Sequence, residues 1–264
     1  MFGLDWNVST LAVRKQKTGF SPLALSGLVA WYDPSDLSSM FQDTAMTAPV
    51  TAAGQSVAVI RDKSGNDRHL SQSAAAARPT LQTDGASFWL AFDGVDDSYG
   101  TGAFDWGSDA AQLVFGLRKT ADDAIGCLLE TSDNSNNYAG TLAVFAPNAT
   151  LNAGTLEFRS KGSTQASAIN FGIPSQTNFV LNAFGRVSSD TTVTRIDGIE
   201  TRNVTTNQGN GNFGNFPLYI GRRANANFPF SGRLFGAVFY NRLLDASETG
   251  SVESWVAGKI GEAL

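Results

Sequence analysis

Three features of the sequence predict an all-β protein, a two-sheet antiparallel β-sandwich with one C-terminal helix. Short apolar runs recur along the chain and are separated by Gly, Asn, Asp and Ser, which favour turns. Apolar residues within the runs alternate with period two, as in strands whose two faces have different surroundings. With 42% hydrophobic and 16% charged residues in a length of 264, the chain can bury one large core.

The apolar runs give the positions of the expected strands. In "SFWLAFD", Phe88, Leu90 and Phe92 fall on one face and Trp89 and Ala91 on the other. Most runs have no helical segment between them, which favours antiparallel sheets packed face to face. The runs are residues 27–33, 56–62, 87–93, 111–117, 124–130, 141–146, 155–160, 178–187, 217–223 and 233–241.

A β-hairpin is predicted in "TVTRIDGIETRNV", where Asp197 and Gly198 join two β-prone arms flanked by Ile196 and Ile199. Glycine at the second turn position accepts a positive φ without steric penalty, and Asp is one of the few other residues that tolerate it.

A helix is predicted in "LLDASETGSVESWVAGKIG" near the end of the chain. Asp245 can cap the first turn while Glu248 reaches back, and Lys259 suits the negative end of the helix dipole. The apolar residues at helical spacing, which would pack on the sandwich, are Val252, Trp255, Val256 and Ile260.

Residues 1–24 differ from the rest because they precede the first strong strand and carry the basic cluster Arg14, Lys15 and Lys17. Two interpretations stay open: an arm that docks onto other proteins, or a segment that frames the edge of the sandwich. We expect an attachment arm at 1–24 and a single sandwich domain at 25–264.

The composition argues against several classes of protein. A net charge of −5 provides no basic face to displace counterions from nucleic acid. No apolar stretch approaches the roughly 20 residues that membrane insertion needs. The single cysteine, Cys127, excludes an intrachain disulfide and a cysteine-based zinc site, and we expect it to be buried. The N-terminus lacks the apolar region of a signal peptide, so we expect synthesis in a cytoplasm, which the resemblance described next implies is bacterial.

A family resemblance rests on four segments in a fixed order: "LVAWYDPSDLSSMFQD" (28–43), "DKSGNDRHLSQ" (62–72), "RPTLQTDG…FWLAFDGVDDSY" (78–99) and the tail 228–261. Over residues 22–264 the chain resembles the concanavalin A-like, laminin-G-like jelly-roll modules of bacterial surface proteins and of bacteriophage and prophage virion proteins. The resemblance implies a jelly-roll sandwich in which "FDGVDD" leaves a core strand, with Phe92 pointing inward. It implies less about function, because such modules bind glycans, bind proteins or are purely structural.

Three carboxylates lie within five residues, at Asp93, Asp96 and Asp97. They fit a metal cage, an acid–base pair or a turn, and Asp at a turn bonds neighbouring backbone N–H groups. We expect the turn. Calcium is the main alternative, because the resemblance implies that such domains often hold one ion at the rim.

A second candidate calcium loop is "DKSGND", with Asp62, Ser64 and Asn66 at alternate positions. An EF-hand needs Gly at the sixth loop position and Glu at the twelfth, but here Gly65 is fourth and Ser73 twelfth. A type I turn ending at Gly65 explains the segment. We therefore expect no metal and no cofactor, with a calcium site shared between rim loops left open.

No catalytic residues are predicted. Glycoside hydrolysis generally needs two positioned carboxyl groups, and no Glu opens the Glu-x-Asp-x-x-Glu pattern of the glucanases that the fold resembles. The one histidine, His69, lies beside Arg68 at a strand start, and no Gly-x-Ser-x-Gly motif is present. We expect His69 to be a surface residue.

Three loops, 132–140, 207–216 and 221–230, have the composition of a glycan site. Aromatic rings stack on sugar C–H faces, while amide and guanidinium groups bond hydroxyls. The alternative is that Asn and Gly are ordinary loop residues and the rings pack into the core. The candidate ligand-binding residues are Asn136, Asn137, Tyr138, Asn212, Phe213, Arg222, Arg223 and Asn225.

The resemblance and the loops together predict a non-enzymatic protein on the surface of a phage or phage-like particle that binds host-surface polysaccharide. We expect it to join other virion proteins through residues 1–24 and to be a homo-oligomer on the particle. The alternatives are a purely structural decoration or fibre protein without glycan binding and, less favoured, a polysaccharide depolymerase.

Overall fold

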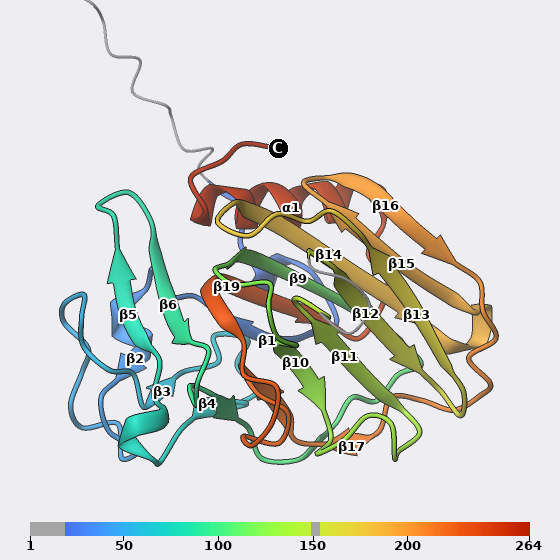
Figure 1. The fold of residues 1–264 in the computed structure, drawn as a ribbon. Helices are drawn as coiled ribbons and strands as arrows, with labels where there is room; N and C mark the ends of the chain where they lie inside the picture. Colours follow the sequence, from blue (N-terminus) through green and yellow to red (C-terminus); the bar gives the residue numbers. More distant parts are fainter. Residues whose placement is uncertain (1–18, 149–153) are drawn as a thin grey trace, which may run out of the picture.

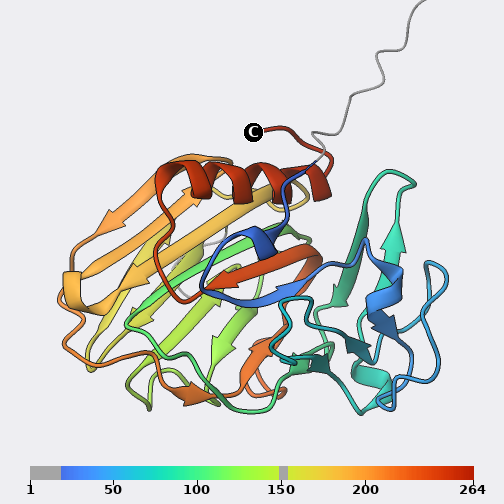
Figure 2. The same ribbon diagram turned by 180° about the vertical axis from the view of Figure 1, so that it is seen from behind.

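The computed structural model describes residues 19–148 and 154–264 and shows two antiparallel sheets packed face to face (Figures 1 and 2). The all-β sandwich and its helix near the C-terminus are confirmed. Each apolar run named above overlaps a strand.

The first sheet has eight strands within the described residues, and all its pairings are antiparallel. Strand β1 (Leu28–Tyr32) pairs with β19 beside the main path. Along that path the order is β16 (Ile199–Val204), β15 (Thr191–Ile196), β14 (Asn178–Arg186), β9 (Ala110–Lys119), β19 (Ser231–Tyr240), β6 (Phe88–Asp93) and β5 (Thr80–Thr83).

The second sheet has nine strands in the described part of the chain. Their order is β13 (Gln165–Asn170), β12 (Leu156–Lys161), β11 (Thr141–Phe145), β10 (Cys127–Thr131), β18 (Leu218–Ile220), β7 (Tyr99–Gly100), β4 (Leu70–Ser71), β3 (Val59–Ile60) and β2 (Met40–Phe41). A small ribbon pairs β8 (Phe104–Asp105) with β17 (Asn215–Phe216). Short 3-10 turns lie at Pro22–Ala24, Leu37–Ser39, Ala75–Ala77 and Val187–Ser189.

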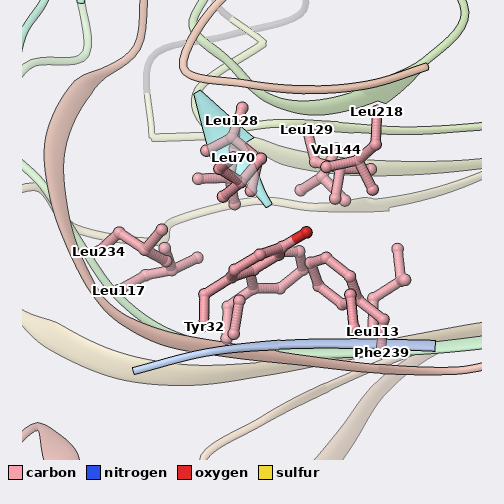
Figure 3. Packing of buried hydrophobic residues seen from close by; sticks show 14 of the residues in the cluster. Tyr32, Leu70, Leu113, Leu117, Leu128, Leu129, Val144, Leu218, Leu234 and Phe239 are labelled. Atoms are coloured by element: carbon pink, nitrogen blue, oxygen red, sulfur yellow. The ribbon is translucent and has the colours of Figure 1, made fainter. Parts of the chain in front are cut away.

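The main hydrophobic core lies between the two sheets (Figure 3). Fully burying one such side chain contributes about 1.5–3 kcal/mol, so this layer dominates the stability of the fold. Leu90 and Phe92 belong to it, whereas Trp89 belongs to a second cluster outside the sheet, which confirms the predicted alternation along β6. Ten of the packed residues are Tyr32, Leu113, Leu117, Leu234 and Phe239 on one side and Leu70, Leu128, Leu129, Val144 and Leu218 on the other.

Helix α1 (Ala246–Lys259) forms a third layer on the outer face of the eight-stranded sheet, over β9, β14 and β19 (Figure 2). The capping box is present: Asp245 accepts from the Glu248 N–H at 2.9 Å, and Glu248 accepts from the Asp245 N–H at 3.0 Å. The second hydrophobic cluster joins Val252, Val256, Ala257 and Ile260 to Trp31, Trp89, Val114, Val180, Phe235, Val238 and Tyr240, with Trp255 at its margin. The predicted apolar stripe is therefore confirmed.

The described end of the predicted attachment arm packs against this helical side. Phe20 and Leu25 contact the second cluster, and the Tyr240 hydroxyl donates to the Pro22 carbonyl at 3.3 Å. Residues 1–18 of the arm lie outside the described residues.

The hairpin of β15 and β16 turns at Asp197 and Gly198, with φ of 50° and 78°, as the sequence predicts. None of the helical segments in the described ranges has the length and hydropathy to cross a lipid bilayer.

Candidate functional site

The candidate site lies on the outer face of the nine-stranded sheet, opposite to the face that packs on the core. Strand register aligns Tyr219, Glu130, Ala143, Arg159 and Ser167 in one row across β18, β10, β11, β12 and β13. Their neighbours along each strand point into the sandwich. Because side chains alternate between faces, this row carries the charges that the core excludes.

A cavity of about 110 Å³ opens above this face. The adjacent row contributes Phe145 and Glu157, which lie opposite each other on β11 and β12. Loops from four parts of the chain complete the walls. The lining residues are Ile125, Asn136, Phe145, Asn148, Arg159, Arg223 and Phe228. The cavity thus combines two rings, two amides and two guanidinium groups.

The first ion pair under the cavity joins Arg223 to Glu130. Nε and Nη2 of Arg223 donate to the two carboxylate oxygens at 2.6 and 3.1 Å, and the Ser135 N–H donates to Oε1 at 2.7 Å. Glu130 is completely buried and Arg223 is 8% exposed. A carboxylate so far from water needs such a partner, because an uncompensated buried charge is very costly.

The second ion pair joins Arg159 to Glu157, again in a bidentate arrangement with two contacts of 2.9 Å. Asn148 donates from its side-chain amide to the same carboxylate. The remaining Nη1 of Arg159 donates to the side-chain oxygen of Asn136 at 3.2 Å. A loop amide at the cavity mouth is therefore tied to the sheet below it.

Two phenylalanines form the apolar part of the cavity. The rings of Phe145 and Phe228 meet edge to face with centroids 6.4 Å apart. The Arg159 guanidinium lies 4.5 Å from the Phe145 centroid, and that of Arg223 lies 4.9 Å from the Phe228 centroid. These cation–π contacts fix the planes of both guanidinium groups.

The turn that brings Arg223 and Phe228 to the cavity has an unusual backbone. Ala224, Asn225 and Phe228 have φ of 50°, 55° and 55°, in the left-handed region that bulky residues rarely adopt. The Arg223 N–H donates to the Asn227 carbonyl at 2.9 Å and closes the turn. Such conformations cluster at functional sites, where the surrounding structure must impose them.

Cys127 lies beside this network and is fully buried, as the sequence predicts. Burial raises the pKa of its thiol well above the ordinary value, and the Glu130 carboxylate adds to the effect. The thiol therefore stays protonated and is a poor nucleophile.

Two of the sequence-predicted site residues, Asn136 and Arg223, line the cavity. Three others lie elsewhere in the loops: Asn137 and Asn212 are exposed, and Tyr138, 42% exposed, packs on Phe216 with ring centroids 5.5 Å apart.

The other three predicted residues are placed differently. Phe213 is inside the main core, edge to face with Trp106 at 6.4 Å, so its ring does not reach a surface ligand, and the alternative of core packing describes it. Arg222 donates to the backbone carbonyls of Asp96 and Ala226, and Asn225 is exposed on the same turn.

Sequence reasoning missed Glu130, Glu157, Arg159, Phe145 and Asn148. For the three charged residues the available signal was a charge at an outward position of an otherwise apolar strand, in "GCLLE" and "TLEFRS". Phe145 and Asn148 carried no such signal. Only the pairing of β10, β11 and β12 shows that these residues share one face.

The acidic corner makes the local bonds that its turn interpretation requires. Asp93 accepts from the N–H groups of Val95 and Asp96 at 2.7 and 3.2 Å, and Asp97 accepts from the Asp93 N–H at 2.9 Å. The three carboxylates offer oxygens within 4.8 Å of one another, so calcium at this corner stays an alternative. Burial raises the pKa of Asp97 to about 6, and the charges of Asp93 and Asp96 act in the same direction.

A wider hollow of about 260 Å³ lies beside the corner. Its polar groups include the exposed carboxylates of Asp93 and Asp123 and the Ser231 hydroxyl, and no aromatic ring lines it. It is therefore less suited to a sugar than the smaller cavity, despite its size.

The loop at 62–67 is tied to strand β1. Asp62 accepts from the Trp31 N–H at 2.9 Å and from the backbone and hydroxyl of Ser64 at 2.9 and 2.7 Å. The Asn66 amide donates to the carbonyls of Leu28 and Val29 at 3.0 Å each. These oxygens and amides hold the loop in place, as a structural turn requires.

No protein-family model matches the chain, and no curated protein sequence matches it. Solved structures match in fold. The botulinum neurotoxin serotype D ligand-binding domain in complex with N-acetylneuraminic acid has a TM-score of 0.58 at 10% identity over 90% of this chain and 53% of that chain. The binding domain of botulinum neurotoxin DC in complex with rat synaptotagmin II has a TM-score of 0.59 at 9% identity over 89% and 52%.

A botulinum neurotoxin type C structure, from a protein that interacts with two ganglioside molecules, has a TM-score of 0.57 at 10% identity over 87% of this chain and 51% of that chain. The chain therefore spans about half the length of the solved structures it matches. At these identities the likeness concerns the β-sandwich fold. Another structure that matches is the receptor-binding domain of botulinum neurotoxin D.

Proposed function

We propose that this chain is a non-enzymatic carbohydrate-binding β-sandwich and that the cavity above β10, β11 and β12 receives a sugar. The observation that carries the proposal is the combination, in one cavity, of the Phe145 and Phe228 rings with the Asn136 amide and the Arg159 and Arg223 guanidinium groups. Rings pack on the C–H faces of a pyranose, and the polar groups bond its hydroxyls. The structural neighbours that bind glycans add support at the level of the fold.

The biological setting is also part of the proposal. We place the protein on the surface of a phage or phage-like particle, as a host-attachment component present in several copies and joined to other virion proteins through residues 1–24. A cavity of about 110 Å³ holds little ligand, so each site binds weakly and repetition on the particle raises the overall affinity. The family resemblance of the sequence motivates this setting.

The arrangement of the two glutamates favours binding over hydrolysis. A glycosidase needs one carboxyl group free to protonate the leaving oxygen and a second to act on the sugar. Glu130 and Glu157 each accept two N–H groups from an arginine, so neither presents free oxygens to a substrate. A depolymerase is therefore the weaker proposal.

A purely structural decoration or fibre protein is the second candidate. It is favoured by the internal use of two predicted ligand residues, since Phe213 packs in the core and Arg223 compensates Glu130. Glycan binding by the isolated protein separates the candidates, because only the first requires it. Deletion of residues 1–18 would abolish incorporation into the particle under both.

The test compares Asn136→Ala with Asn137→Ala on an array of bacterial surface polysaccharides. Both asparagines are exposed in the same loop, but only Asn136 lines the cavity. We expect Asn136→Ala to weaken binding about tenfold, since one hydrogen bond is worth about 1 kcal/mol and the Arg159 contact is also lost. Asn137→Ala should bind like the unmodified chain.

Two results would contradict the proposal. If the protein binds no glycan on the array, carbohydrate binding is excluded and the structural candidate is left. If Asn136→Ala and Asn137→Ala bind glycan equally well, carbohydrate binding is retained but this cavity is excluded as its site.

A further inference from the structure

We propose that the cavity selects a neutral sugar over an acidic one, an inference that rests on the proposed function. Its two guanidinium groups suggest an anion site at first sight. Their partners within the protein lead to the opposite conclusion.

Both guanidinium charges are already compensated by carboxylates of the same chain. Arg223 uses Nε and Nη2 on Glu130, at 2.6 and 3.1 Å, and Arg159 uses Nε and Nη2 on Glu157, at 2.9 Å each. In each case the side of the guanidinium group that best matches a carboxylate is occupied. The two pairs together carry no net charge.

An acidic sugar would have to compete with these internal partners. Glu130 is completely buried and Glu157 is 3% exposed, so neither can turn to water if a ligand carboxylate displaces it. A third carboxylate beside two others is repelled at short range, and a displaced buried charge is costly. The cavity therefore discriminates against anions.

A neutral sugar meets no such competition. The pair with Glu130 leaves Nη1 of Arg223 outside the contact, and the Asn136 amide nitrogen is also outside the bond that its oxygen accepts from Arg159. Hydroxyl and N-acetyl oxygens accept from such donors without bringing charge. Phe145 and Phe228 provide the apolar surface for the ring.

Two further charges, on Lys161 and Asp133, do not reverse this balance. The Lys161 ammonium donates to the carbonyls of Ser135 and Asn136 at 3.0 and 2.9 Å, which holds it under the loop. Asp133 is exposed in the same loop and has the opposite charge. The site thus differs from what an acidic ligand needs, although one structural neighbour was solved with N-acetylneuraminic acid.

The direct test uses pairs of glycans that differ only in charge. An array would carry neutral oligosaccharides beside the matching uronates, in which the C6 hydroxymethyl group is oxidised to carboxylate, and sialylated glycans beside their asialo forms. We expect the unmodified chain to bind the neutral member at least about tenfold more tightly, and its binding to change less than about twofold between 0.05 and 0.5 M NaCl.

Glu157→Gln changes the charge of the site while retaining its shape. The amide can still accept one N–H from Arg159, but the guanidinium charge is then uncompensated. We expect the preference for neutral over acidic sugar to fall about tenfold. Glu200→Gln is the matched control, because it makes the same change in net charge at an exposed position on β16. It should leave the preference unchanged.

The outcomes separate this inference from the proposal on which it rests. Acidic glycans bound as tightly as their neutral partners by the unmodified chain would overturn the inference and keep carbohydrate binding. An array that stays silent for both classes would overturn both. If Glu157→Gln does not fold, the salt dependence of the unmodified chain decides: binding that weakens strongly with NaCl contradicts a neutral ligand.

Discussion

At the scale of single residues, Arg223 shows why a loop residue has two interpretations. Its position in a loop rich in Asn and Gly predicted a ligand contact, whereas the structure places it against the buried Glu130 and at the cavity wall. Loop composition alone cannot reveal that partner, because it lies 93 positions away in the sequence. Both roles are compatible, since a compensated guanidinium group still has free N–H donors.

Replacing Arg223 should therefore destabilise the fold strongly. Arg223→Met leaves Glu130 buried without a partner, and we expect the free energy of unfolding in urea to fall by about 3–5 kcal/mol. Arg222→Met is the control on the same turn, since it removes only hydrogen bonds to carbonyls and should cost about 1 kcal/mol or less. If the free energy of unfolding falls no further for Arg223→Met than for Arg222→Met, the prediction is contradicted. Solvent would then reach the Glu130 carboxylate in the unmodified protein.

Asp97 should make the stability depend on pH. Its pKa is raised to about 6 from 3.8, so the folded state holds this proton more tightly than the unfolded chain. The resulting stabilisation is complete below about pH 4 and is lost as the pH rises through about 6. The difference corresponds to about 1–3 kcal/mol, at 1.36 kcal/mol for each pKa unit.

The measurement is urea unfolding of Asp97→Asn at several values of pH. The amide can still accept from the Asp93 N–H, so we expect the variant to be more stable than the unmodified chain at pH 7 and similar to it at pH 4. Asp67→Asn is the control, because Asp67 is an exposed carboxylate in another loop. This variant should show no gain in stability between pH 4 and pH 7 relative to the unmodified chain. If the free energy of unfolding depends on pH in the same way for Asp97→Asn and for the unmodified chain, the prediction is contradicted and a cation at the corner is favoured.

At the scale of elements, local signals were sufficient for some segments and not for others. The hairpin at Asp197–Gly198 and the capping box at Asp245 and Glu248 depend on neighbours in the sequence, and both are confirmed. Strand β13 was missed because "QASAIN" buries only the small Ala166 and Ala168 and a polar Asn170. Its identity as a strand comes from pairing with β12, which no local pattern reveals.

Helix α1 should be essential to the fold because it covers apolar surface. A chain that ends after Leu244 would expose Trp31, Trp89 and the rest of the second cluster. Several side chains at about 1.5–3 kcal/mol each approach the stability of a whole domain, so we expect aggregation or loss of cooperative unfolding. Thermal melts measure the cooperativity of unfolding, and binding of a hydrophobic dye measures the exposed apolar surface. Ending the chain after Gly261 removes only exposed residues and should leave a cooperative melt.

At the scale of the whole molecule, the sequence predicted the class of fold but not which face carries the site. Period-two runs and turns require only that strands form and that one side of each is buried. The order of strands in each sheet decides that Glu130, Arg159 and Phe145 meet, and this order results from contacts between distant segments. The loops were predicted from composition because Asn and Gly favour turns, whereas their aromatic residues did not reveal whether a ring faces solvent or, like Phe213, the core.

The two outer surfaces of the sandwich give the molecule a direction. Phe20, Leu25 and α1 lie on the outside of the eight-stranded sheet, while the cavity opens on the outside of the nine-stranded one. Both layers, roughly 10 Å apart, stand between the first described residues and the cavity mouth. If a copy is attached to a surface through its N-terminal segment, the opening of its cavity faces away from that surface. The cavities of neighbouring copies would then face outward in the same direction.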